Sequence, residues 1–255
     1  MMNRTTIFAI QMLIVIFIFG AWEIGTKIGM INPKWFSPPI GVLVRLVQET
    51  QGGTFLTHVW ATTVETVAGF GLGVIGGVAL GIALGMTNRL RQILMPYLLM
   101  IYGIPRPALA PIFVLWFGIG LFSKIVLIVS LVYFVLLMYV IVGIRAINPA
   151  LIRLAQTTGA SRSQIVSKIM IPSVMPYIFA GMKLGIGLAI VGAVVGEIIA
   201  SHLGLGHYIY QSAQRGDTQG VYVGLAALGV LSFVLVFGLE WLDRRLFHWR
   251  QEVTL

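Results

Sequence analysis

The sequence contains no cysteine, and only 10% of its residues are charged. Without cysteine the chain cannot form a disulfide framework, a thiolate metal site or a thiol nucleophile. Soluble proteins carry about 25% charged residues, which they need on a solvated surface. A chain with so little charge is therefore not a soluble enzyme, and its surface must meet lipid.

Apolar residues make up 58% of the 255 positions, and the mean hydropathy is +0.96. A helix that crosses a bilayer needs about 20 mostly apolar residues. Six runs satisfy this condition, which predicts an all-α membrane protein with six transmembrane helices and one domain over residues 1–255. The runs are residues 7–28, 62–86, 93–120, 125–144, 172–200 and 221–239.

The basic residues indicate how these spans are oriented. An N-terminus in the cytoplasm places most Lys and Arg side chains inside, among them Arg145 and Arg162, and leaves fewer outside, such as Lys34 and Lys124. The positive-inside rule therefore predicts that both termini are cytoplasmic. Apolar residues at helical spacing within residues 32–51 predict an amphipathic helix on the outer surface.

The second run carries a glycine at every fourth position. A stripe of small residues lets another helix approach closely within lipid. The fifth run contains a weaker stripe, Gly181, Gly185, Ala189 and Ala193. The sequence leaves open whether the second run packs on its own chain or on a second copy. Its stripe consists of Gly69, Gly73, Gly77, Gly81 and Gly85.

Prolines interrupt the third run near its middle. Pro105, Pro107 and Pro111 surround Arg106, and each proline removes a backbone donor. The carbonyls and amides that this frees at membrane depth must face protein or a water-filled cavity. Arg106 lies about 20 Å of helix rise from the cytoplasmic end, near mid-membrane, where a charge marks a candidate functional site.

Two interpretations of Arg106 stay open. In the first, Arg106 lines a translocation pathway together with Tyr102 and Glu197 and contacts an anionic solute. In the second, it pairs with Glu65 or Glu197 and only holds helices together. Glu197 lies near the outer end of the fifth run, where it could also cap a helix. Lys183, in the same run, is expected to extend toward the cytoplasmic interface.

The sequence lacks the motifs of an enzyme. It has no phosphate-cradling G-x-x-x-x-G-K-[ST] loop and no spaced nucleophile, carboxylate or zinc pattern. We expect no catalytic activity and no cofactor in this chain, so an ATP-driven process would need a partner that binds ATP and magnesium. His202 and His207 have no third spaced ligand, and we expect no metal site.

The longest predicted cytoplasmic loop, residues 145–172, reads as helical but does not fit a bilayer. Pro149 can start a helix in its first turn, and Gly159 ends that helix. Ser161 can cap a second helix, with Gln164 at the third following position. The loop is therefore expected to form two short helices around a glycine corner, which suits docking of a cytoplasmic partner.

This loop resembles the signature of permease subunits of bacterial ATP-binding cassette (ABC) importers: E-A-A, three residues, Gly, nine residues, then I-x-L-P. The matching residues are Ala155, Gly159, Ile169, Ile171 and Pro172, whereas Arg153 and Leu154 replace the usual Glu and first Ala. The resemblance extends over nearly the whole chain. FSPPIGVLVRL, VLWFGIGLFSKI and GEIIASHLGLGHYI look like the nitrate, sulfonate and taurine branch of the family.

The resemblance implies the type I importer permease fold in a bacterial inner membrane. It also implies a homodimer, two cytoplasmic cassette ATPase subunits and an external solute-binding protein. The loop would be the coupling helix that carries nucleotide-driven closure to the spans. Its expected contact residues are Arg153, Leu154, Ala155, Thr158, Gly159, Ala160, Ser161, Ile165, Ile169 and Pro172.

The solute that the resemblance implies is small and anionic, like a sulfonate, taurine or nitrate. Import of a heterocycle or an aromatic acid by the same machinery stays open, because the family places most specificity in the binding protein. Two other classes also stay open: a secondary transporter or channel without an ATPase, and a membrane scaffold that transports nothing.

Overall fold

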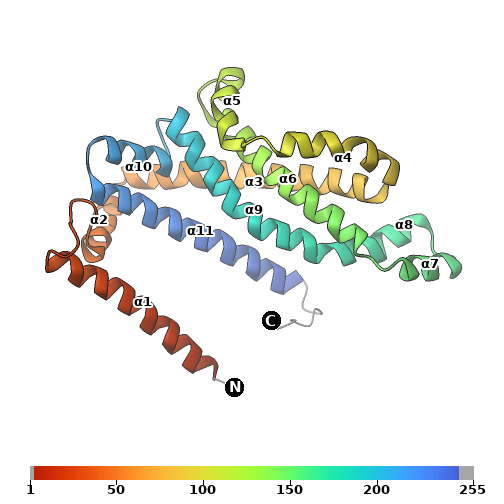
Figure 1. Ribbon diagram of the computed structural model, residues 1–255, viewed down its shortest axis with the longest axis horizontal. Helices are drawn as coiled ribbons and strands as arrows, with labels where there is room; N and C mark the ends of the chain where they lie inside the picture. Colours follow the sequence, from red (N-terminus) through yellow and green to blue (C-terminus); the bar gives the residue numbers. More distant parts are fainter. Residues whose placement is uncertain (1–2, 247–255) are drawn as a thin grey trace.

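The computed structural model describes residues 3–246, which form helices joined by short turns and contain no strand (Figure 1). The helices are α1 (Arg4–Lys27), α2 (Pro39–Gln51), α3 (Thr54–Met86), α4 (Asn88–Tyr102), the 3-10 helix η1 (Arg106–Leu109), α5 (Ala110–Phe117), α6 (Leu121–Arg145), α7 (Pro149–Thr157), α8 (Arg162–Ile165), the π-helix η2 (Val166–Met170), α9 (Ile171–Ala200), α10 (Leu205–Gln214) and α11 (Thr218–Leu246).

The expected all-helical membrane fold is confirmed. Five helical stretches are long and apolar enough to cross a bilayer: α1, α3, α6, the continuous run from α8 to α9, and α11. The third predicted run forms a bent pair, in which α4 and the η1–α5 segment meet at 80°. This bend occurs at the predicted proline cluster, and counting the pair as one span gives the six expected spans.

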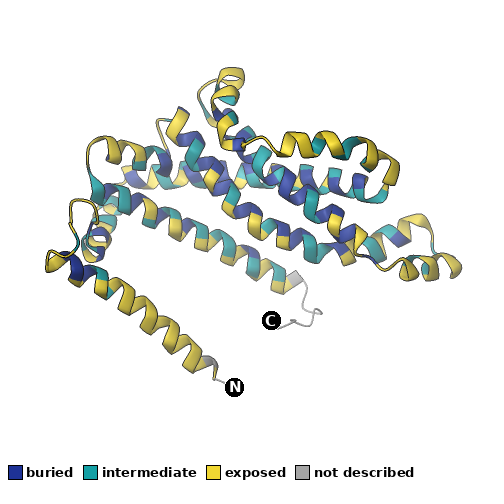
Figure 2. Ribbon diagram, in the orientation of Figure 1, coloured by how far each residue is buried: buried dark blue, intermediate teal, exposed yellow. Residues whose placement is uncertain are grey.

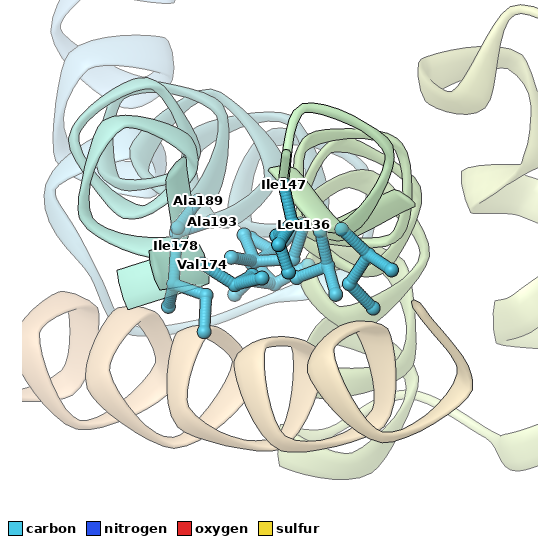
Figure 3. Close-up of a cluster of buried hydrophobic side chains, with 10 residues drawn as sticks. Leu136, Ile147, Val174, Ile178, Ala189 and Ala193 are labelled. Atoms are coloured by element: carbon cyan, nitrogen blue, oxygen red, sulfur yellow. The ribbon is translucent and has the colours of Figure 1, made fainter. Parts of the chain in front are cut away.

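The centre of the molecule is α6, which packs between α3 and α9. The buried core contains Val132, Leu136 and Val140 of α6 together with Ala189 and Ala193 of α9. Figure 3 shows these side chains filling the space between α6 and α9 above the ribbon of α3. The core therefore combines the branched side chains of α6 with both small and branched residues of α9, among them Val174 and Ile178.

The glycine stripe of α3 faces α6 of the same chain. A Cβ atom at Gly73 would lie 2.7 Å from Val132 Cβ, and one at Gly77 would lie 2.5 Å from the Tyr133 carbonyl oxygen. Such distances are shorter than any van der Waals contact, so only glycine allows this approach. The stripe is used for packing within the chain.

The long helices of the bundle run between two ends of the molecule that carry different short helices (Figure 1). At one end, which we call the α10 end, α2, α10 and the N-terminal part of α11 share a core around Val42, Leu205 and Val223. At the other end, α7 and α8 extend beyond the bundle (Figure 1). We call this the α7 end.

Helix α1 lies apart from the bundle and meets the rest of the chain mainly at α2 (Figures 1 and 2). Only 6% of its apolar window is buried, against 50% for the run from α8 to α9. The side chains of α1, such as Phe17 and Ile18, are exposed in this single chain. They are available to lipid or to another protein surface.

Candidate functional site

The loop at the α7 end has the corner that the sequence predicts. Asn148 caps α7 by accepting a hydrogen bond from the Ala150 amide (2.9 Å), and Pro149 occupies the first turn. The helix ends at Gly159, whose φ is +82°. The Gly159 amide donates to the Gln156 carbonyl, and the Ala160 amide donates to the Ala155 carbonyl. This pair of bonds is a Schellman motif, which closes a helix at glycine.

The second helix of the loop starts as predicted but does not end separately. Ser161 and Gln164 form a reciprocal capping box. The helix then widens into the π-turn η2, where the Ile171 amide donates to the Val166 carbonyl, and it continues into α9. Pro172 has no amide hydrogen to donate, and its ring would clash with the preceding turn of a regular helix. The wider turn relieves this clash.

The corner leaves apolar surface exposed beyond the bundle. Leu151 and Leu154 of α7 are 50% and 62% exposed. A hollow of about 360 Å³ lies inside the corner, lined by Gly159, Lys168 and Ile169 among others. Of the residues expected to contact a partner, Ile165 is buried and Ala155, Ala160 and Ile169 are half-buried. The exposed ones are Arg153, Leu154, Thr158, Gly159, Ser161 and Pro172.

The guanidinium of Arg106 fills the break between α4 and η1. It donates to the carbonyls of Ile101 (2.9 Å), Ile104 (3.2 Å) and Ser130 (3.1 Å), and it lies 4.1 Å from the ring centroid of Phe134. Arg106 is 8% exposed, whereas Tyr102 beside it is 52% exposed. The arginine therefore supplies donors to carbonyls beside the break, among them that of Ile104, and ties the break to α6 through Ser130.

The ionic partners proposed from the sequence for Arg106 are wrong. Glu65 is paired with Lys124, which the sequence analysis placed in an outer loop but which is 5% exposed in the first turn of α6. Glu197 is engaged elsewhere. Backbone carbonyls compensate the charge of Arg106 because the proline break supplies them at the same depth.

Glu197 is completely buried and caps α10, one of the alternatives left open by the sequence. Its Oε1 accepts a hydrogen bond from the Thr62 hydroxyl (2.6 Å) and its Oε2 accepts one from the Gly206 amide (2.6 Å). Gly206 lies in the first turn of α10, where a carboxylate is favourable because the amides there lack helical acceptors.

Lys183 has acidic partners on another helix. Its Nζ lies 3.5 Å from Glu240 and 3.7 Å from Asp243, both on α11, and the lysine side chain is 40% exposed. Its acidic partners follow the sixth predicted run, so a reading of the fifth run alone could not find them.

A bidentate ion pair fixes α2 at the α10 end. Arg45 donates from Nη1 and Nη2 to the two carboxylate oxygens of Asp217 (2.7 and 2.6 Å), just before α11. The Arg45 guanidinium lowers the pKa of Asp217, and Asp217 in turn raises that of Arg45. Burial and the nearby Glu49 raise the pKa of Tyr208 to about 12. The amphipathic helix is thus held to the bundle by charge as well as by Val42.

Within residues 3–246, no group of three His, Asp or Glu side chains could hold a metal ion. The residues that sequence reasoning missed are Thr62 and Lys124. Both lie where an apolar run begins, so the sequence gives no sign that they are buried. Their positions relative to Glu65 and Glu197 become visible only when α3, α6 and α9 are packed together.

The comparisons with known proteins agree with this geometry. Residues 73–248 match the family described as the binding-protein-dependent transport system inner membrane component. The chain belongs to this family. The permease is similar to the taurine transport system permease protein TauC of Escherichia coli (strain K12), with 32% identity covering 91% of this chain and 86% of the relative. It also resembles the riboflavin transport system permease protein RibX of Chloroflexus aurantiacus, with 33% identity covering 89% and 85%.

Solved structures show the same fold. The chain matches the permease in a structure titled "Inward facing conformations of the MetNI methionine ABC transporter" with a TM-score of 0.69, 21% identity, and coverage of 77% of this chain and 98% of the other. The permease is thus a multi-pass membrane subunit of an ABC importer, a class that works with an ATPase and a binding protein. Its resemblance to taurine and sulfonate permeases is confirmed.

Proposed function

We propose that the permease works as a homodimer with two cytoplasmic cassette ATPase subunits and an outer solute-binding protein, and that it imports a small organic anion of the sulfonate type. The observation that carries this proposal is the corner at Gly159, a protruding and apolar docking element in a chain without a phosphate-binding loop. An importer driven by ATP must receive its energy through such a surface.

The α7 end is proposed to be cytoplasmic, with both termini on the same side of the membrane. Arg145, Arg153, Arg162 and Lys168 gather at or near this end, which fits the positive-inside rule. The exposed Leu151 and Leu154 would enter an apolar cleft of the ATPase, and the Schellman corner would fix the angle at which α7 is presented. Movement of the ATPase would reach the bundle directly, because α8 continues through η2 into α9.

The pathway is proposed to follow the broken span. Tyr102 supplies an exposed ring at the break, and Arg106 holds the break in place from the buried side through its three carbonyl contacts. Glu197 supports the pathway from within the bundle, since both its oxygens accept hydrogen bonds and its side chain is fully buried. Tyr102 is therefore the residue that we propose to contact the solute.

The sulfonate class is supported by two relatives. They are TauC, and the putative aliphatic sulfonates permease SsuC of Bacillus subtilis, which is 28% identical over 91% of this chain. The second candidate is a heterocycle. It is favoured by RibX, and by the formylaminopyrimidine permease ThiX of Halalkalibacterium halodurans, which is 29% identical over 91% of the chain.

The solute test compares uptake in cells with and without this permease. Cells that carry it should accumulate radiolabelled taurine, an excess of an unlabelled alkanesulfonate should compete, and riboflavin should not. The matched control is a strain whose permease carries a bulky residue at Gly159. Accumulation of riboflavin or a pyrimidine that taurine does not reduce would replace the sulfonate class with the heterocycle class.

A further inference from the structure

Side chains from three spans converge on one short turn at the α10 end. We call Ser201–Gly206 the turn: it joins α9 to α10 and includes the first two residues of α10. The Gly204 amide donates to His58 Nδ1 (3.1 Å), the Leu205 amide donates to the Thr62 hydroxyl (2.7 Å), and Lys124 donates to the Ser201 hydroxyl (3.0 Å). Together with the bond from Gly206 to Glu197, these contacts bind the turn to α3, α6 and α9.

Two glycines allow the turn to lie directly on the Glu197 carboxylate. A Cβ atom at Gly204 would lie 2.2 Å from Glu197 Cδ, and one at Gly206 would lie 2.7 Å from the Val194 carbonyl oxygen. Gly204 also has a φ of +115°, which other residues rarely adopt. The turn is therefore built for close backbone contact with a buried acid.

Thr62 occupies the centre of this arrangement. Its hydroxyl donates to Glu197 and accepts from the Leu205 amide, and the residue is 0% exposed. Loss of the hydroxyl would leave a buried carboxylate oxygen and a buried amide without these partners, which is unfavourable in an interior that excludes water. Thr62 thus links the core helix α3 to the first turn of α10.

Helix α10 presents a polar surface beyond the bundle. Tyr210, Gln211 and Gln214 are exposed on it, while Leu205 and Ser212 are buried beneath it. Because polar bonds hold its first turn, α10 must follow any movement of α3 and α9. A helix attached only by apolar contacts could slide over those spans instead.

We propose that Thr62 and Glu197 are positioning residues that couple α10 to the core spans, so that movements of α3 and α9 change the surface that α10 offers to the solute-binding protein. This inference rests on the proposed function: if the α7 end is cytoplasmic, the α10 end faces outward, on the side of the solute-binding protein. Thr62 acts through α10 and does not contact the solute.

The test uses the complete transporter in lipid nanodiscs. ATP hydrolysis is measured against increasing amounts of the binding protein recovered with the wild type and saturated with taurine. Thr62→Val, which keeps the shape and removes the hydroxyl, should raise the half-saturating concentration of binding protein at least fivefold while the maximal rate changes less than twofold. Thr62→Ser, which keeps the hydroxyl, should behave like the wild type.

A second variant keeps the test decisive if Thr62→Val does not assemble. Ser201→Ala removes the bond to Lys124 and the hydroxyl's bonds to the Leu203 backbone at the edge of the turn, and it should raise the half-saturating concentration about twofold. Unchanged half-saturation in the variants that assemble, or a fall in the maximal rate alone, would overturn the coupling role. A wild-type transporter that no binding protein stimulates would contradict the proposed function instead.

Discussion

At the scale of single residues, Arg106 has the most specific environment in the membrane part of the chain. Its guanidinium satisfies two carbonyls at the end of α4 and one on α6, and it stacks on Phe134. Lysine has one nitrogen on a flexible stem, so it cannot reach α4 and α6 in the same geometry. The role of Arg106 therefore depends on the shape of its side chain as well as on its charge.

Both Arg106→Ala and Arg106→Lys should reduce solute uptake at least tenfold while the permease still assembles with its ATPase. Loss of the three guanidinium hydrogen bonds and of the contact with Phe134 loosens the break rather than unfolding the bundle, because the Ile101 carbonyl keeps the Ile104 amide as a donor. Uptake and the amount of associated ATPase are measured on the same membranes. Wild-type uptake in Arg106→Ala would remove this residue from the pathway.

The Arg45–Asp217 pair gives a prediction about pH. Because Arg45 lowers the folded-state pKa of Asp217, the pair stabilises the fold above the unfolded pKa of about 3.9, and this stability is lost as pH falls through the lower folded value. The pair is partly exposed, so Asp217→Asn should cost at most about 1 kcal/mol at pH 7.

Thermal unfolding of the detergent-solubilised protein checks this prediction. The difference between wild type and Asp217→Asn should be present at pH 7 and should shrink below about pH 4. Arg45→Gln combined with Asp217→Asn should lose little more than either change alone, because the two groups act as a pair. A difference that grows as pH falls would contradict the assignment.

The sequence predicted residues well where the signal was local. The cap at Ser161, the corner at Gly159 and the break around Arg106 depend on neighbours within a few positions. The acidic partners proposed for Arg106 were wrong, and the partners of Lys124 and Lys183 were not predicted. Glu65, Glu240 and Asp243 lie on other helices, and the pattern within one run contains no information about them.

At the scale of elements, the stripe on α3 sets how closely two helices approach. The sequence predicted the stripe and left its partner open, and α6 fills that place with branched side chains at the same fourfold spacing. The six apolar runs predicted the spans, with the third run bent at its prolines. The continuity of α8 with α9 was missed because the fifth predicted run began at Pro172, and a single π-turn accommodates this proline here.

Gly77→Ala should destabilise the permease by about 1–3 kcal/mol, because the added methyl group would overlap the Tyr133 carbonyl of α6. The matched control is Gly71→Ala in the same helix, where nothing lies within 4 Å of the new atom. Thermal unfolding in detergent measures both. Equal effects of the two substitutions would mean that the stripe does not set the distance between α3 and α6.

The corner at Gly159 is constrained by its backbone rather than by crowding, since no atom lies within 4 Å of an added Cβ. Gly159→Val should therefore strain the corner by about 1–2 kcal/mol and turn α7 away from its docking angle. Asparagine tolerates this conformation better, so Gly159→Asn is the control and should retain more function.

The readouts for Gly159→Val are ATPase association and solute uptake, measured together. We expect both to fall at least fivefold, with Gly159→Asn between this variant and the wild type. Normal uptake and normal stimulated hydrolysis in Gly159→Val would count against the coupling role of the loop.

At the scale of the whole molecule, this chain is one part of a larger assembly. Its central core lies between α3, α6 and α9, and α1 lies apart with almost all of its apolar surface exposed. Leu115 and Trp116 at the tip of α5 are 83% and 70% exposed. A chain with so much exposed apolar surface needs lipid and other subunits around it, in agreement with the family to which it belongs.

The central claim is that this permease is driven by a cassette ATPase docked at the α7 end. The most direct measurement is to purify the chain from its native membranes in mild detergent and to determine which proteins come with it, in what stoichiometry. We predict two copies of this chain with two copies of a cassette ATPase. An intact chain that comes out without an ATPase under several gentle conditions, and whose uptake in vesicles follows an ion gradient without ATP, would contradict the account.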